Sequence, residues 1–333
     1  MPTMCFPEVS WSSYTCSMVG PPVRSFLLIA FGISWGIAGV GALFGVDTAH
    51  PAYPAVAAIC MLGPAIAALV QWRLMERAAW STVGLHPARI RWHGLLSTVL
   101  VGVCIVPLTL AVIHLFGDGL AVGAFGHVEV SGARFAERVA AIMSEQGLAA
   151  RGGVVERLAG LPGAGILFAL LAVAVVAAFT INLPFMLGEE LGWRGYLFGA
   201  LRSWPPIRRV SFTGAVWGAW HAPLIAMGHN YPGHPVVGIL LMVLFCVLLA
   251  LLFDHARWRS GSVWAPCVLH GIINGSAGAY LLFAEGGHVL VASPAGIAGC
   301  IAIALLATVV LLMDGAYRRA FLRPTEPDTR TPL

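Results

Sequence analysis

The sequence has very little charge. Charged residues make up only 10% of the chain, whereas 59% of its residues are hydrophobic. A soluble domain carries about 25% charged residues, so this chain cannot cover a surface that faces water. Its 19 basic residues are all arginine, and they form no dense basic run. These absences exclude a soluble α/β enzyme and a disordered chain, argue against a nucleic-acid partner, and predict an integral membrane protein.

Paired cysteines are also missing. The seven cysteines form no C-x-x-C pair, and five of them lie inside apolar stretches, which indicates free buried thiols instead of a disulfide framework or a zinc ribbon. No basic residue precedes Arg24. We therefore expect the apolar run after Arg24 to be a first membrane span and not a cleaved leader.

Apolar stretches long enough to cross a membrane, about 20 residues each, recur along the whole chain. They predict an all-α fold, a polytopic transmembrane bundle of about eight spans, in a single integral membrane domain 1–333. The predicted spans are 25–45, 54–72, 93–116, 165–201, 208–227, 235–253, 262–283 and 295–313. The fourth is too long for one straight crossing, so we expect a bend near Pro184, whose ring removes a backbone donor.

The arginines predict the orientation. All but four of them fall on the side of the two termini, and those four lie in the loop 117–161 among offsetting acidic residues. The positive-inside rule then places both termini in the cytoplasm. The loop 117–161 is predicted to be extracytoplasmic and partly helical, and the polar tail 323–333 to be disordered.

Ionisable side chains inside a span each cost about 3 kcal/mol or more, so they are candidate functional residues. The first group is Glu189, Glu190 and Arg194. Adjacent helical residues point about 100° apart, so the two carboxylates face different partners. Glu190 and Arg194 have the i, i+4 spacing of an ion pair, which leaves Glu189 free to act as a base. The alternative is a charged cluster at a helix end.

Two further groups have the same spacing of four residues. Trp217 and His221 share one helix face, and His270 and Asn274 share another. Each pair alone could be an ordinary polar contact between helices. Glu189, however, lies about as far along its helix from the nearest terminal-side arginine as the two histidines do, roughly 17–20 Å. This shared depth predicts one water-filled pocket.

A carboxylate, two imidazoles and an amide around a water could hydrolyse a bond in two ways. Without a metal, Glu189 would take the proton of the water while the histidines and Asn274 stabilise an oxyanion. With a divalent metal such as zinc, Glu189, His221 and His270 would be three ligands beside one open position. The zinc motif HExxH is absent, and the sequence leaves both mechanisms open.

The segments EELGWR, WGAWH and HGIIN resemble, in this order, the motifs EExxxR, FxxxH and HxxxN of the CPBP (Abi) family of intramembrane proteases, which includes the type II CAAX prenyl endopeptidase. The resemblance covers 165–283 and implies a helical catalytic core there. Trp217 stands where the pattern commonly has phenylalanine. The implied site residues are Glu189, Glu190, Arg194, His221, His270 and Asn274.

The resemblance implies an intramembrane endopeptidase whose partners are the lipid bilayer and a peptide or lipidated protein. Glu189 would activate the water, Glu190 and Arg194 would support it, and His221 and His270 would polarise the water or ligate a metal. The arginine-rich, lysine-free composition suggests a bacterial plasma membrane, where a CAAX substrate is not expected. Two rival functions remain open: a transporter or proton-coupled carrier, and a catalytically silent immunity or scaffold protein.

Overall fold

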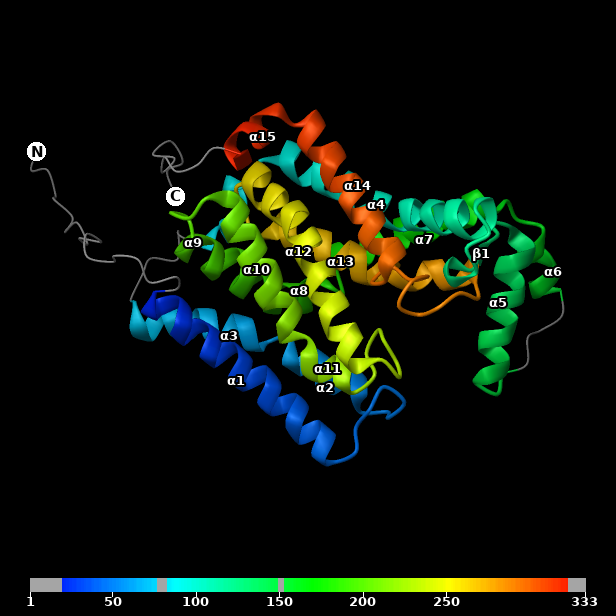
Figure 1. Cartoon of the computed structure of the whole chain (residues 1–333), viewed down its shortest axis with the longest axis horizontal. Helices are drawn as coiled ribbons and strands as arrows, with labels where there is room; N and C mark the ends of the chain where they lie inside the picture. The colour runs from blue at the N-terminus through cyan, green and yellow to red at the C-terminus, as the bar shows by residue number, and fades with distance from the viewer. Residues whose placement is uncertain (1–19, 77–82, 149–152, 323–333) are drawn as a thin grey trace, which may run out of the picture.

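The chain is almost entirely helical in the computed structural model, which describes residues 20–76, 83–148 and 153–322. Within these ranges the two strands, β1 (His127–Val128) and β2 (Ala284–Glu285), form a single short antiparallel ladder. The predicted all-α fold is therefore confirmed (Figure 1). The predicted tail 323–333 lies outside the described residues.

Fifteen α-helices follow one another within the described ranges, some of them joined by π-helical or 3₁₀ turns. They are α1 (Pro21–Leu43), α2 (Tyr53–Cys60), α3 (Gly63–Val70), α4 (Trp92–Ile113), α5 (Gly132–Glu145), α6 (Val154–Ala159), α7 (Gly163–Phe179), α8 (Leu183–Glu190), α9 (Phe198–Ala200), α10 (Pro206–Trp220), α11 (Ala222–Ala226), α12 (Pro235–Ser260), α13 (Trp264–Ser276), α14 (Ile297–Met313) and α15 (Gly315–Leu322).

Four helical segments in the described part of the chain are long and apolar enough to cross a membrane, and there are up to six if each of two bent pairs forms one span. The four are Pro21–Leu43, Tyr53–Met75, Trp92–Gly119 and Pro235–Ser260. The sequence predicts about eight. The difference lies mainly in 208–227 and 262–283, where α10 and α13 are only 15 and 13 residues long. Such helices, about 20 Å in length, are shorter than the hydrocarbon core.

The bend predicted near Pro184 is present. Helices α7 and α8 meet at 64° across a short break, and Pro184 lies in the first turn of α8, where a missing backbone N–H leaves no hydrogen bond unmade. The side-chain amide of Asn182 donates to the carbonyl of Gly271 at 3.0 Å. This hydrogen bond joins the break between α7 and α8 to α13, and it therefore fixes the angle at which α8 enters the bundle.

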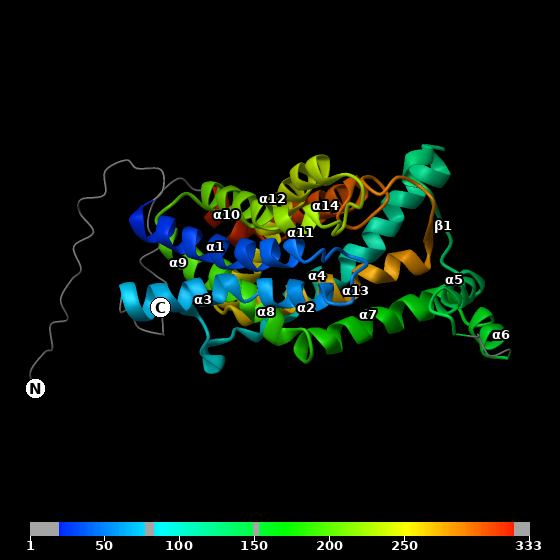
Figure 2. The same ribbon diagram turned by 90° about the horizontal axis from the view of Figure 1, so that it is seen from below.

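Helices α12 and α13 form the centre of the bundle. Helix α12 packs against α10, α14 and α4, and α13 packs against α7, α4 and α8. The pair α5 and α6 lies at the end of the molecule farthest from α9 and α15 in both views (Figures 1 and 2). Within the described parts of 117–161, namely 117–148 and 153–161, the chain forms α5 and α6 at this end of the bundle.

The outer faces of the long helices are apolar and exposed. Leu43 on α1 is 88% exposed, Met313 on α14 is 83% exposed, and Leu28 on α1 is 75% exposed. Large exposed apolar surfaces are rare on soluble monomers. Lipid chains, in contrast, are a favourable environment for such side chains, so the surface agrees with an integral membrane protein.

Candidate active site

The first motif lies where α8 continues into a π-helical turn, Leu191–Leu197, in which every residue is buried. Glu189 and Glu190 are the last residues of α8. A π-turn inserts an extra residue into the helix and is found frequently at functional sites. Here it accommodates Arg194 inside the bundle, where a guanidinium requires a negative partner.

That partner is Glu190. One nitrogen of Arg194, Nη1, donates to both carboxylate oxygens of Glu190 at 3.0 Å each. Glu190 is fully buried, and Arg194 is 3% exposed. The predicted i, i+4 ion pair is confirmed. The ring of His270 on α13 adds a third member, because its Nδ1 lies 2.9 Å from Oε1 of Glu190.

Glu189 has a different partner, as the angle between adjacent helical residues predicts. Its Oε2 accepts a hydrogen bond from the indole Nε1 of Trp217 on α10 at 2.8 Å. The Trp217 ring also lies 5.5 Å from the His270 ring and 5.7 Å from the His221 ring, measured between centroids. Trp217 is therefore the residue around which the three motifs meet.

The two imidazoles are held in the same way. Nδ1 of His221 lies 2.8 Å from the carbonyl oxygen of Trp217, and Nδ1 of His270 faces the carboxylate of Glu190. Both partners only accept hydrogen bonds, so each Nδ1 carries the proton. In the neutral rings each Nε2 then presents a lone pair, which can accept a proton or a hydrogen bond.

Asn274 lies one helical turn beyond His270 at the exposed edge of this cluster. Its side-chain nitrogen lies 3.6 Å from the sulfur of Met186 on α8, and no hydrogen bond joins it to Glu189 or to the histidines within the described structure. Five of the six predicted site residues are thus connected directly or through Trp217, and Asn274 lies beside them.

Close contact between backbones brings the motif helices together. A Cβ atom built at Gly218 on α10 would lie 2.5 Å from the Cα of Val243 on α12, and one at Gly192 would lie 2.5 Å from the Cβ of Pro64 on α3. Only glycine allows such approaches, which are a common packing mode of membrane helices. Trp217 and Arg194, neighbours of these glycines in sequence, are placed by them.

The described residues do not fit a metal centre. They include no group of three or more histidine, cysteine, aspartate or glutamate side chains that could hold a metal ion. Oε2 of Glu189 is bonded to an indole, and the His270 Nδ1 is bonded to Glu190. The three-ligand arrangement of Glu189, His221 and His270 is therefore not assembled, and we derive no step through a metal.

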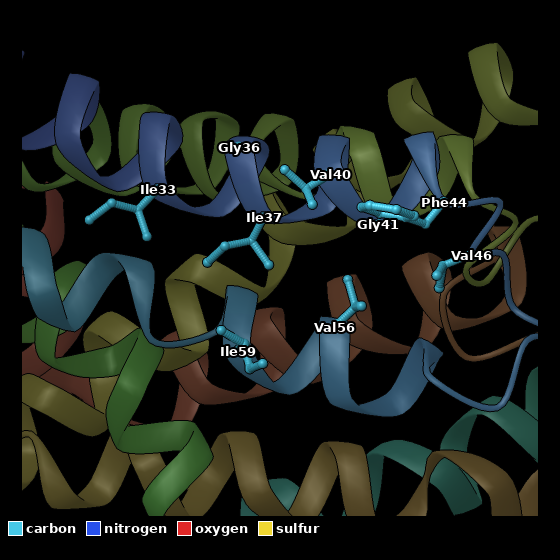
Figure 3. Close-up of a pocket in the computed structure, with 9 residues that line it drawn as sticks. All are labelled: Ile33, Gly36, Ile37, Val40, Gly41, Phe44, Val46, Val56 and Ile59. Atoms are coloured by element: carbon cyan, nitrogen blue, oxygen red, sulfur yellow. The ribbon is translucent and has the colours of Figure 1, made fainter.

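Two cavities are found in the described structure, and neither is lined by Glu189, His221 or His270. One is an apolar groove of about 640 Å³ between α1 and α2 (Figure 3). The other is a cavity of about 10 Å³, lined in part by Arg194, Arg209 and Asp254, which has room for about one water molecule. The shared pocket around Glu189, His221 and His270 stays a prediction.

Sequence reasoning missed a second buried ion pair. Arg209 on α10 donates through Nε and Nη2 to Asp254 on α12, at 2.8–3.1 Å, and the hydroxyl of Tyr317 on α15 donates to Oδ2 of Asp254 at 3.0 Å. In the sequence, Arg209 is only one of the arginines on the side of the two termini. Its partner is 45 residues away, a distance at which no helical spacing gives a signal.

Comparison with known proteins gives two matches. Residues 162–276, which run from α7 to α13, match the family described as type II CAAX prenyl endopeptidase Rce1-like. A stretch of 44 residues is 46% identical to CAAX prenyl protease 2 of Methanococcus maripaludis, over 13% of this chain and 16% of that relative. The family match contains all three motifs and every residue of the cluster around Trp217.

Proposed function

We propose that this integral membrane protein is an intramembrane endopeptidase in which Glu189 activates the attacking water, because residues 162–276 match the family described as type II CAAX prenyl endopeptidase Rce1-like. The observation that carries the mechanism is the position of Glu189. It is buried and bonds to Trp217, whose ring lies 5.7 Å from the His221 ring and 5.5 Å from the His270 ring. Within the described structure the Nε2 atoms of both imidazoles have no hydrogen-bond partner.

The proposed reaction is a general-base hydrolysis. Glu189 takes a proton from a water molecule, and the resulting hydroxide attacks the carbonyl carbon of the scissile peptide bond. His221, His270 and Asn274 stabilise the oxyanion that forms. As the carbon–nitrogen bond breaks, Glu189 returns the proton to the leaving amine.

Glu190 and Arg194 support this centre without touching the substrate. The carboxylate of Glu190 keeps the proton of His270 on Nδ1, and Arg194 balances the charge of Glu190. A carboxylate behind a histidine is a common device for setting the tautomer and the orientation of the ring.

We propose a peptide or lipidated protein held at the membrane as the substrate, because the site lies among membrane helices. The relative that matches the 44-residue stretch carries the name CAAX prenyl protease. We place the catalytic core at 165–283 within one membrane domain. We also place both termini in the cytoplasm, since Arg202, Arg208 and Arg318 lie in or beside α9, α10 and α15, away from the loop 117–161. We propose a bacterial cell on the arginine-rich, lysine-free composition alone.

The test is peptide cleavage by the purified protein in lipid vesicles. The substrates are a farnesylated peptide and its unlipidated counterpart. We expect Glu189→Gln to lower the cleavage rate by about 100- to 10,000-fold, the usual contribution of a general base, with an unchanged melting temperature. Cleavage by Glu189→Gln at the wild-type rate would overturn the proposed mechanism. A loss with chelator that zinc restores would assign the water to a metal instead.

A further inference from the structure

The carboxylate of Glu189 is held on one side only. Oε2 accepts the indole hydrogen bond of Trp217 at 2.8 Å, whereas Oε1 accepts none from the residues that the structure describes. Trp217 itself is 3% exposed. Its ring is fixed by the Phe253 ring at 5.2 Å between centroids and by the Arg194 guanidinium carbon at 4.3 Å from the centroid.

This indole bond is not a general property of buried tryptophan in this protein. The N–H groups of Trp193 and Trp220 are equally buried and have no hydrogen-bond partner within the described structure. Trp193 is fully buried and packs edge-on against Phe26. Of these three buried tryptophans, the one that is bonded donates to the carboxylate that we propose as the base.

A glutamate side chain has three rotatable bonds, and its terminal carboxylate rotates easily. A hydrogen bond to an ionised acceptor is stronger than a neutral one and adds direction as well as energy. Because the indole is locked by its neighbours, its N–H fixes the plane of the Glu189 carboxylate. The orientation of the second carboxylate oxygen, Oε1, is then set before the water binds.

We propose that Trp217 is a positioning residue: its indole N–H holds Oε2 of Glu189 and leaves Oε1 as the oxygen that takes the proton of the water. This inference rests on the proposed function of Glu189. It also gives a physical meaning to the tryptophan at this place in the WGAWH segment, since phenylalanine offers the same aromatic face but no donor.

The experiment removes the donor and keeps the ring. Trp217 is replaced by benzothienylalanine, in which sulfur occupies the place of the indole N–H, and in a second variant by phenylalanine. Cleavage of the farnesylated peptide is measured in lipid vesicles. We expect kcat to fall by about 10- to 100-fold, which corresponds to one charge-assisted hydrogen bond, while KM stays within about twofold.

Trp193 supplies the matched control, since the same replacements there remove a buried N–H that has no partner. We expect kcat of the Trp193 variants to stay within about twofold of wild type. The inference is overturned if the Trp217 and Trp193 variants lose kcat equally, or if the Trp217 variants change KM alone. Either result leaves Glu189 as the proposed base.

A second readout does not depend on activity. The indole N–H resonance of Trp217, identified among the 11 tryptophans by its absence in Trp217→Phe, should move upfield in Glu189→Gln, because an amide oxygen is a weaker acceptor than a carboxylate. The Trp193 resonance should not move. An unmoved Trp217 resonance would disprove the hydrogen bond, whereas wild-type cleavage by Glu189→Gln would disprove the function of Glu189.

Discussion

The part of the chain that the structure describes contains two arginine–carboxylate pairs in which both side chains are buried, and the pairs differ in how completely their hydrogen bonds are made. In the pair of Arg209 and Asp254, two guanidinium nitrogens donate, and each carboxylate oxygen accepts two bonds, one of them from Tyr317. In the pair of Arg194 and Glu190, a single nitrogen serves both oxygens, and Nη2 of Arg194 has no partner within the described structure.

The difference separates an ion pair that joins two helices from the cluster in which we propose that the reaction takes place. Both oxygens of Asp254 already accept two hydrogen bonds each, so this carboxylate has no acceptor capacity left, and the pair joins α10 to α12. The pair at the motifs keeps unused capacity on Arg194 and, beside it, on Glu189. Buried polar groups without partners are rare in native proteins and require an explanation. The cavity of about 10 Å³ that Arg194 lines has room for about one water molecule, and in the proposed mechanism the unused oxygen of Glu189 binds the attacking water.

The largest effects should come from the same small change made in each pair. Glu190→Gln and Asp254→Asn each leave a buried guanidinium without a carboxylate, so each should lower the free energy of unfolding by about 3–5 kcal/mol. Only Glu190→Gln should also lower the cleavage rate per folded molecule, because His270 depends on Glu190. Thermal unfolding and cleavage in the same vesicles measure both quantities. Lost activity in folded Asp254→Asn would contradict the comparison.

A second change replaces the ion pair of Arg209 and Asp254, together with the Tyr317 hydroxyl, by apolar groups. The triple variant Arg209→Met, Asp254→Leu and Tyr317→Phe removes every polar partner together. Apolar replacement of a buried ion network is often neutral or stabilising by about 1–4 kcal/mol. We therefore expect at least wild-type stability and full cleavage.

The matching control is made at the motifs. The double variant Glu190→Leu, Arg194→Met should fold and lose cleavage, because His270 then has no carboxylate to set its proton. If the triple variant at Arg209 were the inactive one, the assignment of the two pairs would be reversed.

Part of this site could be predicted from local spacing alone. The ion pair of Glu190 and Arg194 follows from i, i+4 geometry, and the separate environments of the two glutamates follow from helical rotation. The bend near Pro184 follows from the missing backbone donor of proline. These features depend only on residues that are close in the chain.

The rest depends on tertiary packing. The indole of Trp217 reaches Glu189 because glycines let α10 and α8 approach their neighbours closely. No pattern within WGAWH predicts the hydrogen bond between Trp217 and Glu189. The pair of Arg209 and Asp254 joins two helices far apart in sequence. The predicted spans at 208–227 and 262–283 are interrupted after Trp220 and Ser276, where apolar composition continues although the α-helix ends.

A smaller effect should follow from moving α10, which contributes to both clusters. In Gly218→Ala the new methyl group would lie 2.5 Å from the Cα of Val243, so α10 must shift from α12. Overpacking of this kind costs about 1–3 kcal/mol, and the displaced Trp217 should lower cleavage as well. The control is Gly32→Ala on α1, which meets nothing within 4 Å and should raise helix stability by about 0.5–1 kcal/mol. Equal free energies of unfolding for the two variants would show that the close approach of Gly218 to Val243 does not position α10.

The smallest effect concerns His229, in the loop between α11 and α12. His229 is half-buried, and its ring lies 6.0 Å from that of Tyr53. Burial lowers the pKa of His229 from its ordinary value of about 6.5. Below about pH 6.5 the unfolded chain therefore binds a proton that the folded chain takes up only at lower pH, so stability falls as the solution is acidified.

The test compares the melting temperature at pH 7.5 and at pH 5.5 in wild type and in His229→Gln. We expect the melting temperature to fall less in His229→Gln than in wild type, and we expect this difference to be smaller than any effect of the changes at the two ion pairs. An equal fall would mean that this histidine, unlike the buried pairs, does not affect folding.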